Sequence, residues 1–265
     1  MSHDMDAVPV PAFTRTVDAS LDPAPPRALT AWSGLNCSVL FCDVAGFGDP
    51  SRDDEDRRVV RETTYRILLT ALEASGVDLA HTYREDRGDG ALVIVSPAVP
   101  TSALVDPLAG HLAVALRRHN HRASEAVRIQ LRAALHVGPI TPDVEGLNGQ
   151  AIIQAARLLE APALKTALAE RGADLGFIVS PFVYDAFVAH LQGPVDRASF
   201  ERVTVEVKET ATEGWMYLAG TGLPVRRAAA PRSPDPGRSQ GSTVFSADVE
   251  VHGDLVLGNK IINER

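Results

Sequence analysis

The stretch CSVLFCDVAGFG, residues 37–48, places an acid and two glycines at the end of a short apolar run. The central letters VLFC have the length and composition of a buried strand. Asp43 ends that run, and an acid at such a place is costly to desolvate unless it is paired or holds a cation. Gly46 and Gly48 follow, so the backbone can turn sharply and come close to a ligand.

A helical pattern begins about ten residues after this stretch. A strand, an acid, a glycine loop and a helix in this order suit a metal and a phosphate, because free backbone N–H groups and a helix start favour anions. The alternative interpretation is a plain strand-end turn with a solvated Asp43. The stretch alone does not distinguish the two.

Composition limits the class of protein. The chain has 265 residues, is 45% hydrophobic and carries a net charge of -8, which predicts one domain with extensions or two small ones and argues against non-specific nucleic-acid binding. Cys37 and Cys42 fall on opposite faces of one predicted strand, so no disulfide is expected and a reducing cytoplasm fits. We see no signal peptide and no apolar run long enough to span a bilayer.

The hydrophobic pattern predicts alternating elements beyond the first strand. Strands are expected at 79–83, 91–95, 127–137, 175–179, 203–208 and 214–219, and helices at 59–74, 107–119, 150–159, 162–170 and 181–190. The order is β-α-β-β-α-β followed by α-β-α-β-β, and its first half is the ferredoxin-like order. The predicted fold class is therefore α+β, with a mainly antiparallel sheet and helices on one face.

Composition also divides the chain. Residues 1–32 are rich in Pro, Ala and Asp and are predicted to be disordered. The ordered domain is expected at 33–220. Residues 221–241 are rich in Pro and Arg and are predicted to be a linker. Residues 242–265 regain strand character.

A second acid, Asp89, lies at the tip of a predicted hairpin, in the turn REDRGDG of residues 84–90. An acid between glycines is also ordinary turn chemistry. In a ferredoxin-like order, however, this tip can lie beside the end of the first strand, so that Asp43 and Asp89 face one point. Two carboxylates there would suit Mg²⁺ or Mn²⁺ and in-line phosphoryl or nucleotidyl transfer.

Gln154 and Arg157 share one face of a predicted helix, because they are three residues apart. The other side is expected to carry apolar residues, among them Ile152 and Ile153. Arg157 could supply fixed positive charge to a transition state. The alternative is that both polar residues are simply solvated.

These residues together resemble the class III nucleotide cyclase (adenylate/guanylate cyclase) catalytic domain, over about residues 33–220. VLFCDVAGFG looks like the family's first metal strand. The resemblance implies that Asp43 and the Val44 carbonyl bind two divalent cations, Mg²⁺ or Mn²⁺. It also implies that Gly46, Phe47 and Gly48 form a loop on the substrate phosphates.

Four further motifs follow in the family's order. RGDGALVIV resembles the second metal hairpin and implies Asp89 as a metal ligand. LRAALHVGPI implies Arg132 as a phosphate-binding residue, with His136 at a strand end. GQAIIQAARL implies Arg157 as the transition-state stabiliser, with Gln154 where the family has a sugar-orienting Asn. VKETATEGWMYL implies Lys208 as a phosphate-binding residue.

The chain departs from the family where the base is recognised. Glu85 stands where purine-selective members have a Lys, and an ionised carboxylate cannot donate a hydrogen bond. A second base-reading acid falls near Leu147. Glu85 could accept from the exocyclic amine of cytosine or adenine, which predicts CTP or ATP over GTP or UTP. Arg84 or Arg87 is close enough in sequence to neutralise Glu85.

The C-terminal segment STVFSADVEVHGDLVLGNKIIN contains short β-branched runs broken by Gly-Asp and Gly-Asn. Such a segment suits cross-β stacking between chains. It resembles the amyloid-like signalling motifs at the ends of some bacterial immunity-type proteins, which implies a homotypic protein partner and a role in signalling or defence. The alternative is a last hairpin packed on the domain, or a free end.

Two functions remain open from the sequence. In the first, a homodimeric enzyme converts a nucleoside triphosphate to a 3′,5′-cyclic monophosphate and pyrophosphate, with Arg157 reaching in from the partner chain. In the second, a catalytically degenerate domain binds a nucleotide or dimerises, and residues 242–265 recruit a partner.

Overall fold

The computed structural model describes residues 27–143, 146–191, 193 and 195–221. The sequence predictions for residues 1–26, for the linker from 222 onward and for the C-terminal motif lie outside the described residues. A short helix, α1 (Arg27–Ala31), lies within the segment for which the sequence predicts no regular structure. It is held because Leu29 and Trp32 are buried in a core.

The remaining helices are α2 (Asp54–Ala74), α3 (Leu108–Asn120), α4 (Gln150–Leu159), α5 (Pro162–Arg171) and α6 (Pro181–Ala186). The strands are β1 (Asn36–Val44), β2 (Thr82–Asp86), β3 (Gly90–Val95), β4 (Leu131–Pro139), β5 (Thr141–Asp143), β6 (Gly146–Asn148), β7 (Ala173–Val179), β8 (Phe200–Val207) and β9 (Thr210–Thr221).

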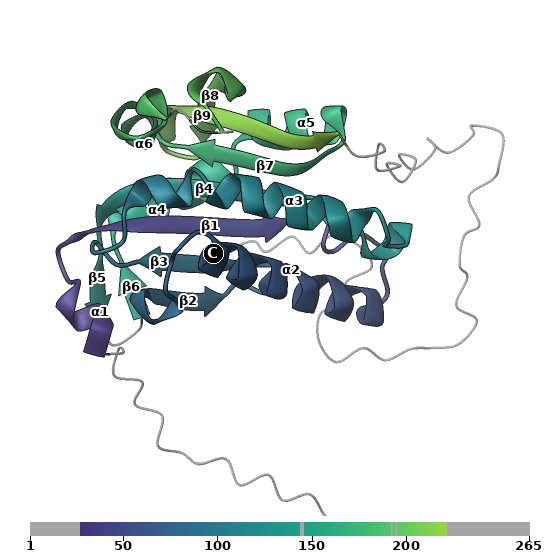
Figure 1. Cartoon of the computed structure of the whole chain (residues 1–265), viewed down its shortest axis with the longest axis horizontal. Coiled ribbons are helices and arrows are strands. Elements are labelled where there is room, and N and C mark those ends of the chain that lie inside the picture. Colours follow the sequence, from purple (N-terminus) through teal and green to yellow (C-terminus); the bar gives the residue numbers. More distant parts are fainter. Residues whose placement is uncertain (1–26, 144–145, 192, 194, 222–265) are drawn as a thin grey trace, which may run out of the picture. The chain divides into compact units, whose positions relative to one another are not determined.

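Seven strands form one sheet in the order β2-β3-β1-β4-β7-β9-β8 (Figure 1). All neighbouring pairs are antiparallel except β4 and β7. The first four strands, with α2 and α3, have the ferredoxin-like arrangement. The predicted α+β class with a mainly antiparallel sheet is therefore confirmed. A separate small sheet, β5 with β6, was not predicted from the sequence.

The expectation that helices cover one face of the sheet is wrong. On β1, Leu40 and Cys42 belong to the core under α2 and α3, whereas Val39 lies in a core with α1 and α4. A third core lies under α4 and α5. Every residue of β3 is buried. Continuous apolar runs such as GALVIV are typical of strands covered on both faces.

Two glycines bring α4 close to the end of β4. A Cβ at Gly138 would lie 2.9 Å from the Cβ of Ala151, and one at Gly149 would lie 2.8 Å from the carbonyl oxygen of Pro139. Gly149 also has φ 153, a conformation that favours glycine. Ala151 and Ala155 can therefore pack directly on the sheet.

The buried face of α4 differs from the expected one. Ala151, Ala155 and Leu158 are buried, while Ile153 is 39% exposed. The close approach to β4 at Gly138 leaves room only for a small side chain at Ala151, whereas Leu158 packs in the core under α4 and α5. Gln154 and Arg157 are consequently partly buried and not fully solvated.

The hairpin before β3 is shifted along the chain from its expected place. Residues Leu79–His81 form a short 3-10 turn, capped by the Asp78 carboxylate, and β2 begins only at Thr82. Glu85 therefore lies in a strand, opposite Leu92, and not in the turn expected at 84–90. The cap explains the shift, because an acid that binds the backbone two residues ahead favours a turn over a strand.

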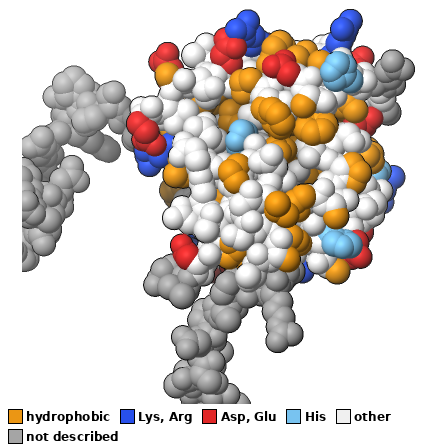
Figure 2. Space-filling view, turned by 90° about the vertical axis from the view of Figure 1, so that its left-hand side faces the viewer, with side chains coloured by type: hydrophobic (Ala, Val, Ile, Leu, Met, Phe, Trp, Pro, Cys, Tyr) orange, Lys and Arg blue, Asp and Glu red, His pale blue; other side chains and the backbone are white. Residues whose placement is uncertain are grey.

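Within the described part of the chain, no helix is both long and apolar enough to cross a membrane. Figure 2 looks onto the end of the molecule where β1 begins. Apolar side chains occupy much of the centre of that view, and charged side chains lie mainly nearer its margins. The acids predicted for a site lie toward the other end of β1.

Candidate functional site

Asp43 lies at the end of β1 between two neighbouring strands. Gly90 of β3 is its partner on one side and Arg132 of β4 on the other. The Arg132 guanidinium donates two hydrogen bonds to the Asp43 carboxylate, from Nε to Oδ1 at 2.7 Å and from Nη2 to Oδ2 at 2.6 Å. The Arg132 side chain is 14% exposed and the Asp43 side chain is 18% exposed. Register thus produces a bidentate, mostly buried ion pair.

Several groups act on the Asp43 carboxyl. Burial raises its pKa, and the hydrogen bonds and charge of Arg132 act against that rise. The Asp89 charge raises this pKa further, while the Lys165 charge on α5 lowers it. A cation held between Asp43 and Asp89 would relieve the repulsion of the two acids.

The β2–β3 hairpin tip reaches the end of β1, as the sequence predicts. The backbone N–H of Val44 donates to the carbonyl of Asp89, with N and O 3.0 Å apart. A Cβ at Gly90 would lie 1.9 Å from the Cys42 carbonyl oxygen, so only glycine allows this approach. The Asp89 side chain is exposed. The structure therefore brings together Asp43, Val44 and Asp89.

The hairpin is also braced against α2 by a contact that the sequence did not suggest. The Tyr65 hydroxyl lies 2.7 Å from an Asp86 carboxylate oxygen and 3.0 Å from the Gly90 carbonyl oxygen. Arg61 pairs with the same Asp86. These residues are more than twenty positions apart along the chain, so spacing gave no signal of the contact.

Glu85 has a cationic partner in the hairpin. Arg87 lies 3.0 Å from its carboxylate and also stacks over the Phe41 ring, 5.7 Å from the ring centre. Of the two arginines that could neutralise Glu85, Arg87 does so. The other, Arg84, is exposed.

The glycine loop after β1 is partly anchored. Gly46 has φ 66 and is exposed, as is Gly48, whereas Phe47 packs against the core under α2 and α3. The expectation that the following helix start favours an anion is wrong. The Asp53 carboxylate already caps the N-terminus of α2, and the first turn carries three acids. These negative charges offset the positive end of the helix dipole, so a further anion is not favoured there.

Arg157 belongs to a second cluster. Its guanidinium pairs with Glu209 at 2.8 Å, in the turn between β8 and β9. Its Nε is buried without a partner. Lys208, next to Glu209, is exposed and has φ 52. Among the residues that the structure describes, no hydrogen bond or ion pair joins this cluster to the Asp43–Arg132 pair. Sequence reasoning had identified Arg157 and Lys208, but not Glu209.

The expectation that His136 lies at a strand end is wrong. His136 lies within β4, opposite Val39 of β1. Its Nδ1 is buried without a hydrogen-bond partner, and burial lowers the pKa of its imidazole. The strand continues to Pro139 because β1 pairs with it over its full length.

The donor set at the end of β1 fits a hard divalent cation in chemistry. Carboxylate and carbonyl oxygens are the ligands that Mg²⁺ and Mn²⁺ prefer, and Asp43, Asp89 and the Val44 backbone provide them. Each Asp43 oxygen accepts one hydrogen bond from Arg132, so a cation there would either use the remaining lone pairs of the carboxylate or replace Arg132. Within the described ranges no group of three or more His, Cys, Asp or Glu side chains could hold a metal.

No protein-family model matches the chain, and no curated protein matches it. Among solved structures, the guanylyl cyclase Cya2 is similar at TM-score 0.49 and 17% identity, covering 71% of this chain and 94% of that chain. An adenylate/guanylate cyclase/hydrolase from Silicibacter pomeroyi is similar at TM-score 0.49 and 23% identity, covering 69% and 95%.

The guanylate cyclase domain of RhGC from Catenaria anguillulae, solved in complex with GTP, is similar at TM-score 0.45 and 15% identity, covering 71% of this chain and 97% of that chain.

Proposed function

We propose that this chain is a class III nucleotide cyclase, which converts a nucleoside triphosphate to a 3′,5′-cyclic monophosphate and pyrophosphate. The observation that carries the proposal is the meeting of three separate segments at the end of β1. Asp43, the Val44–Asp89 backbone contact and Arg132 lie together there, and each occupies a position that the sequence motifs assign to metal or phosphate binding.

In this proposal Asp43, Asp89 and the Val44 carbonyl hold two divalent cations, Mg²⁺ or Mn²⁺. Such cations, when bound, lower the pKa of a hydroxyl and neutralise phosphate charge. The exposed Gly46–Gly48 loop, with Phe47 anchored in the core, lies against the phosphates. Arg132 exchanges its hydrogen bonds to Asp43 for bonds to a phosphate, whose geometry its planar fork also fits.

Arg157 and Gln154 act on the substrate of a partner chain in this proposal. Within one chain Arg157 pairs with Glu209, and no hydrogen bond or ion pair among the described residues joins it to Asp43 or Arg132. A homodimer with composite sites brings the two clusters together. Arg157 then stabilises charge that develops at the α-phosphate, Gln154 orients the sugar, and Lys208 binds a phosphate.

We propose that Glu85 contributes to the choice of base. Because Arg87 neutralises its charge, the carboxylate accepts a hydrogen bond from an exocyclic amine without the full cost of an unpaired buried charge. CTP or ATP is accordingly preferred over GTP or UTP.

A second function is favoured by the pairing of the candidate residues with one another. Arg132 is paired with Asp43, and Arg157 with Glu209. A domain that keeps these pairs binds a nucleotide or dimerises without turnover. In that case residues 242–265 recruit a protein partner by homotypic stacking, in bacterial signalling or defence.

The deciding assay uses the purified full chain, Mn²⁺ and each of the four triphosphates separately, with mass detection of cyclic product. We expect product, with CTP or ATP preferred. Asp89→Asn is the main test variant, because this acid is exposed and its change leaves the Asp43–Arg132 pair in place. Asp185→Asn is the matched control, since Asp185 is an exposed acid on α6.

We expect Asp89→Asn and Arg157→Ala each to lose about a hundredfold or more in rate, and Asp185→Asn to retain the wild-type rate. Full activity in Asp89→Asn would remove the metal role of that acid. Nucleotide binding by calorimetry with no product from any triphosphate would select the second function.

A further inference from the structure

The outer surface between α2 and the end of α3 is hollowed and strongly basic. Two adjoining hollows, of about 560 and 440 Å³, share Arg118 and Arg122. Arg117 lines the first and Arg66 of α2 lines the second. We call this region the α2–α3 groove, defined by these four arginines. Among the described residues that line the two hollows there is no acidic side chain, although the whole chain carries a net charge of -8.

The groove collects most of the described arginines that lack a partner. The arginines whose side chains make neither an ion pair nor a hydrogen bond with another described residue are Arg66, Arg84, Arg117, Arg118, Arg122 and Arg197. All but Arg84 and Arg197 line the groove. Several arginines outside the groove pair with nearby acids, as Arg58 does with Glu55 and Glu62.

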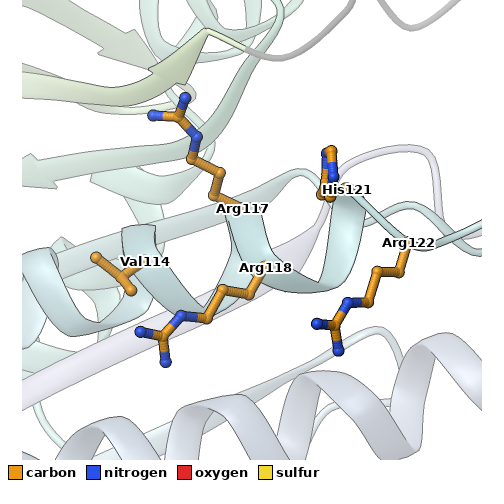
Figure 3. Close-up of a pocket in the computed structure, with 5 residues that line it drawn as sticks. All are labelled: Val114, Arg117, Arg118, His121 and Arg122. Carbon is orange, nitrogen blue, oxygen red and sulfur yellow. The ribbon is translucent and has the colours of Figure 1, made fainter.

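The like charges of the groove repel one another, and a bound anion would relieve that repulsion. Arg118 and Arg122 line both hollows. Figure 3 shows both side chains extending in the same direction, toward α2, which carries Arg66. The macrodipole of α3 favours cations in its last turn, which accounts for Arg117 and Arg118. It does not account for Arg66, which lies in the interior of α2.

We propose that the α2–α3 groove binds a small phosphorylated ligand with at least two phosphate groups, of the nucleoside polyphosphate class. Planar guanidinium forks match phosphate oxygens bidentately. The volumes of both hollows are those of small-molecule sites. Ile67 and Ala115 contribute apolar surface beside the arginines, which suits a base or a sugar ring. The groove shares no residue with the candidate active site.

The test measures binding of inorganic tripolyphosphate, and separately of ATP, to the full chain by calorimetry in excess EDTA. The chelator removes divalent cations, so binding in the groove is separated from metal-dependent binding at Asp43 and Asp89. We expect saturable binding with one ligand per chain. Tighter binding of ATP than of tripolyphosphate would add the ring contact to the phosphate contact.

The variant Arg118→Gln/Arg122→Gln removes the two arginines that both hollows share. We expect it to weaken tripolyphosphate binding by about tenfold or more. The variant Arg171→Gln/Arg197→Gln removes the same charge outside the groove and should bind as wild type does. Arg118→Lys/Arg122→Lys keeps the charge without the fork and should fall between the two.

Equal affinity of the wild type and both glutamine variants would overturn the proposal, as would a failure of both phosphate ligands to bind. Binding to anionic vesicles or to poly-glutamate, without binding of tripolyphosphate, would overturn it in favour of a membrane or an acidic protein. Loss of cyclase activity does not enter these measurements, so this proposal and the proposed function fail separately.

Discussion

At the scale of single residues, the pair formed by Asp43 and Arg132 is the contact that most constrains the candidate site. Two short hydrogen bonds hold the carboxylate and the guanidinium in one plane. Each group satisfies the charge of the other where both are mostly removed from water. Removing one partner therefore does more than remove one contact, because it leaves the other charge unpaired.

We predict that Asp43→Ala destabilises the fold by about 1–3 kcal/mol, below the range for fully buried pairs because both groups keep some solvent contact. Asp43→Ala/Arg132→Met should recover much of that loss, because no unpaired charge remains. Urea denaturation followed by circular dichroism gives both values. A double variant that is no more stable than Asp43→Ala alone would contradict the explanation.

His136 predicts a specific dependence of stability on pH. Burial lowers its pKa in the folded chain, so the unfolded chain binds more protons in the window just below the ordinary histidine pKa of about 6.5. The free energy of unfolding should fall as pH decreases through that window. His136→Gln should make this fall shallower, whereas His190→Gln, at an exposed position, should not. An unchanged pH slope in His136→Gln would show that the imidazole is not the source.

At the scale of elements, the packing of α4 on β4 positions Gln154 and Arg157. The contact depends on Gly138, because a Cβ there would come within 2.9 Å of Ala151. The helix carries its small residues toward the sheet and its arginine toward the β8–β9 turn. The place of Arg157 is thus fixed by a glycine on another element.

We predict that Gly138→Ala lowers the free energy of unfolding by about 1–3 kcal/mol through overpacking, and lowers catalytic rate by displacing α4. Gly48→Ala is the stability control, since a Cβ at Gly48 meets nothing within 4 Å, and it should be nearly neutral. Thermal unfolding of both variants makes the comparison. A neutral Gly138→Ala would mean that α4 can move without cost.

At the scale of the whole molecule, the candidate residues form two clusters that one chain does not join. Asp43, Asp89 and Arg132 lie at the end of β1, whereas Arg157 and Lys208 lie around Glu209. In the homodimer that we propose, the first cluster of each chain meets the second cluster of the other. Such an arrangement has a direct consequence for mixed chains.

Mixing inactive Asp43→Asn chains with inactive Arg157→Ala chains should restore cyclase activity, because each mixed dimer has one site free of both changes. We choose Asp43→Asn because the amide can still accept a hydrogen bond from Arg132. Recovery approaching one quarter of the wild-type rate is expected for random exchange, as about half of the dimers are mixed and each has one working site. No recovery, with exchange confirmed by mass spectrometry, would place the whole site within one chain.

The sequence by itself determined the α+β class and the ferredoxin-like order, because strand and helix periods are local properties of the chain. It predicted the span of α4 at 150–159, where the apolar pattern ends at charged and proline residues. It also predicted that the β2–β3 hairpin tip lies beside Asp43, because in a ferredoxin-like order the tip of this hairpin can lie next to the end of the first strand.

Only the tertiary structure decided what each polar group contacts. The pairing of Arg132 with Asp43 follows from strand register, and that of Arg157 with Glu209 from the meeting of two distant elements. The cover of helices on both faces of the sheet likewise depends on packing. These contacts join residues far apart in the chain, so no local pattern records them.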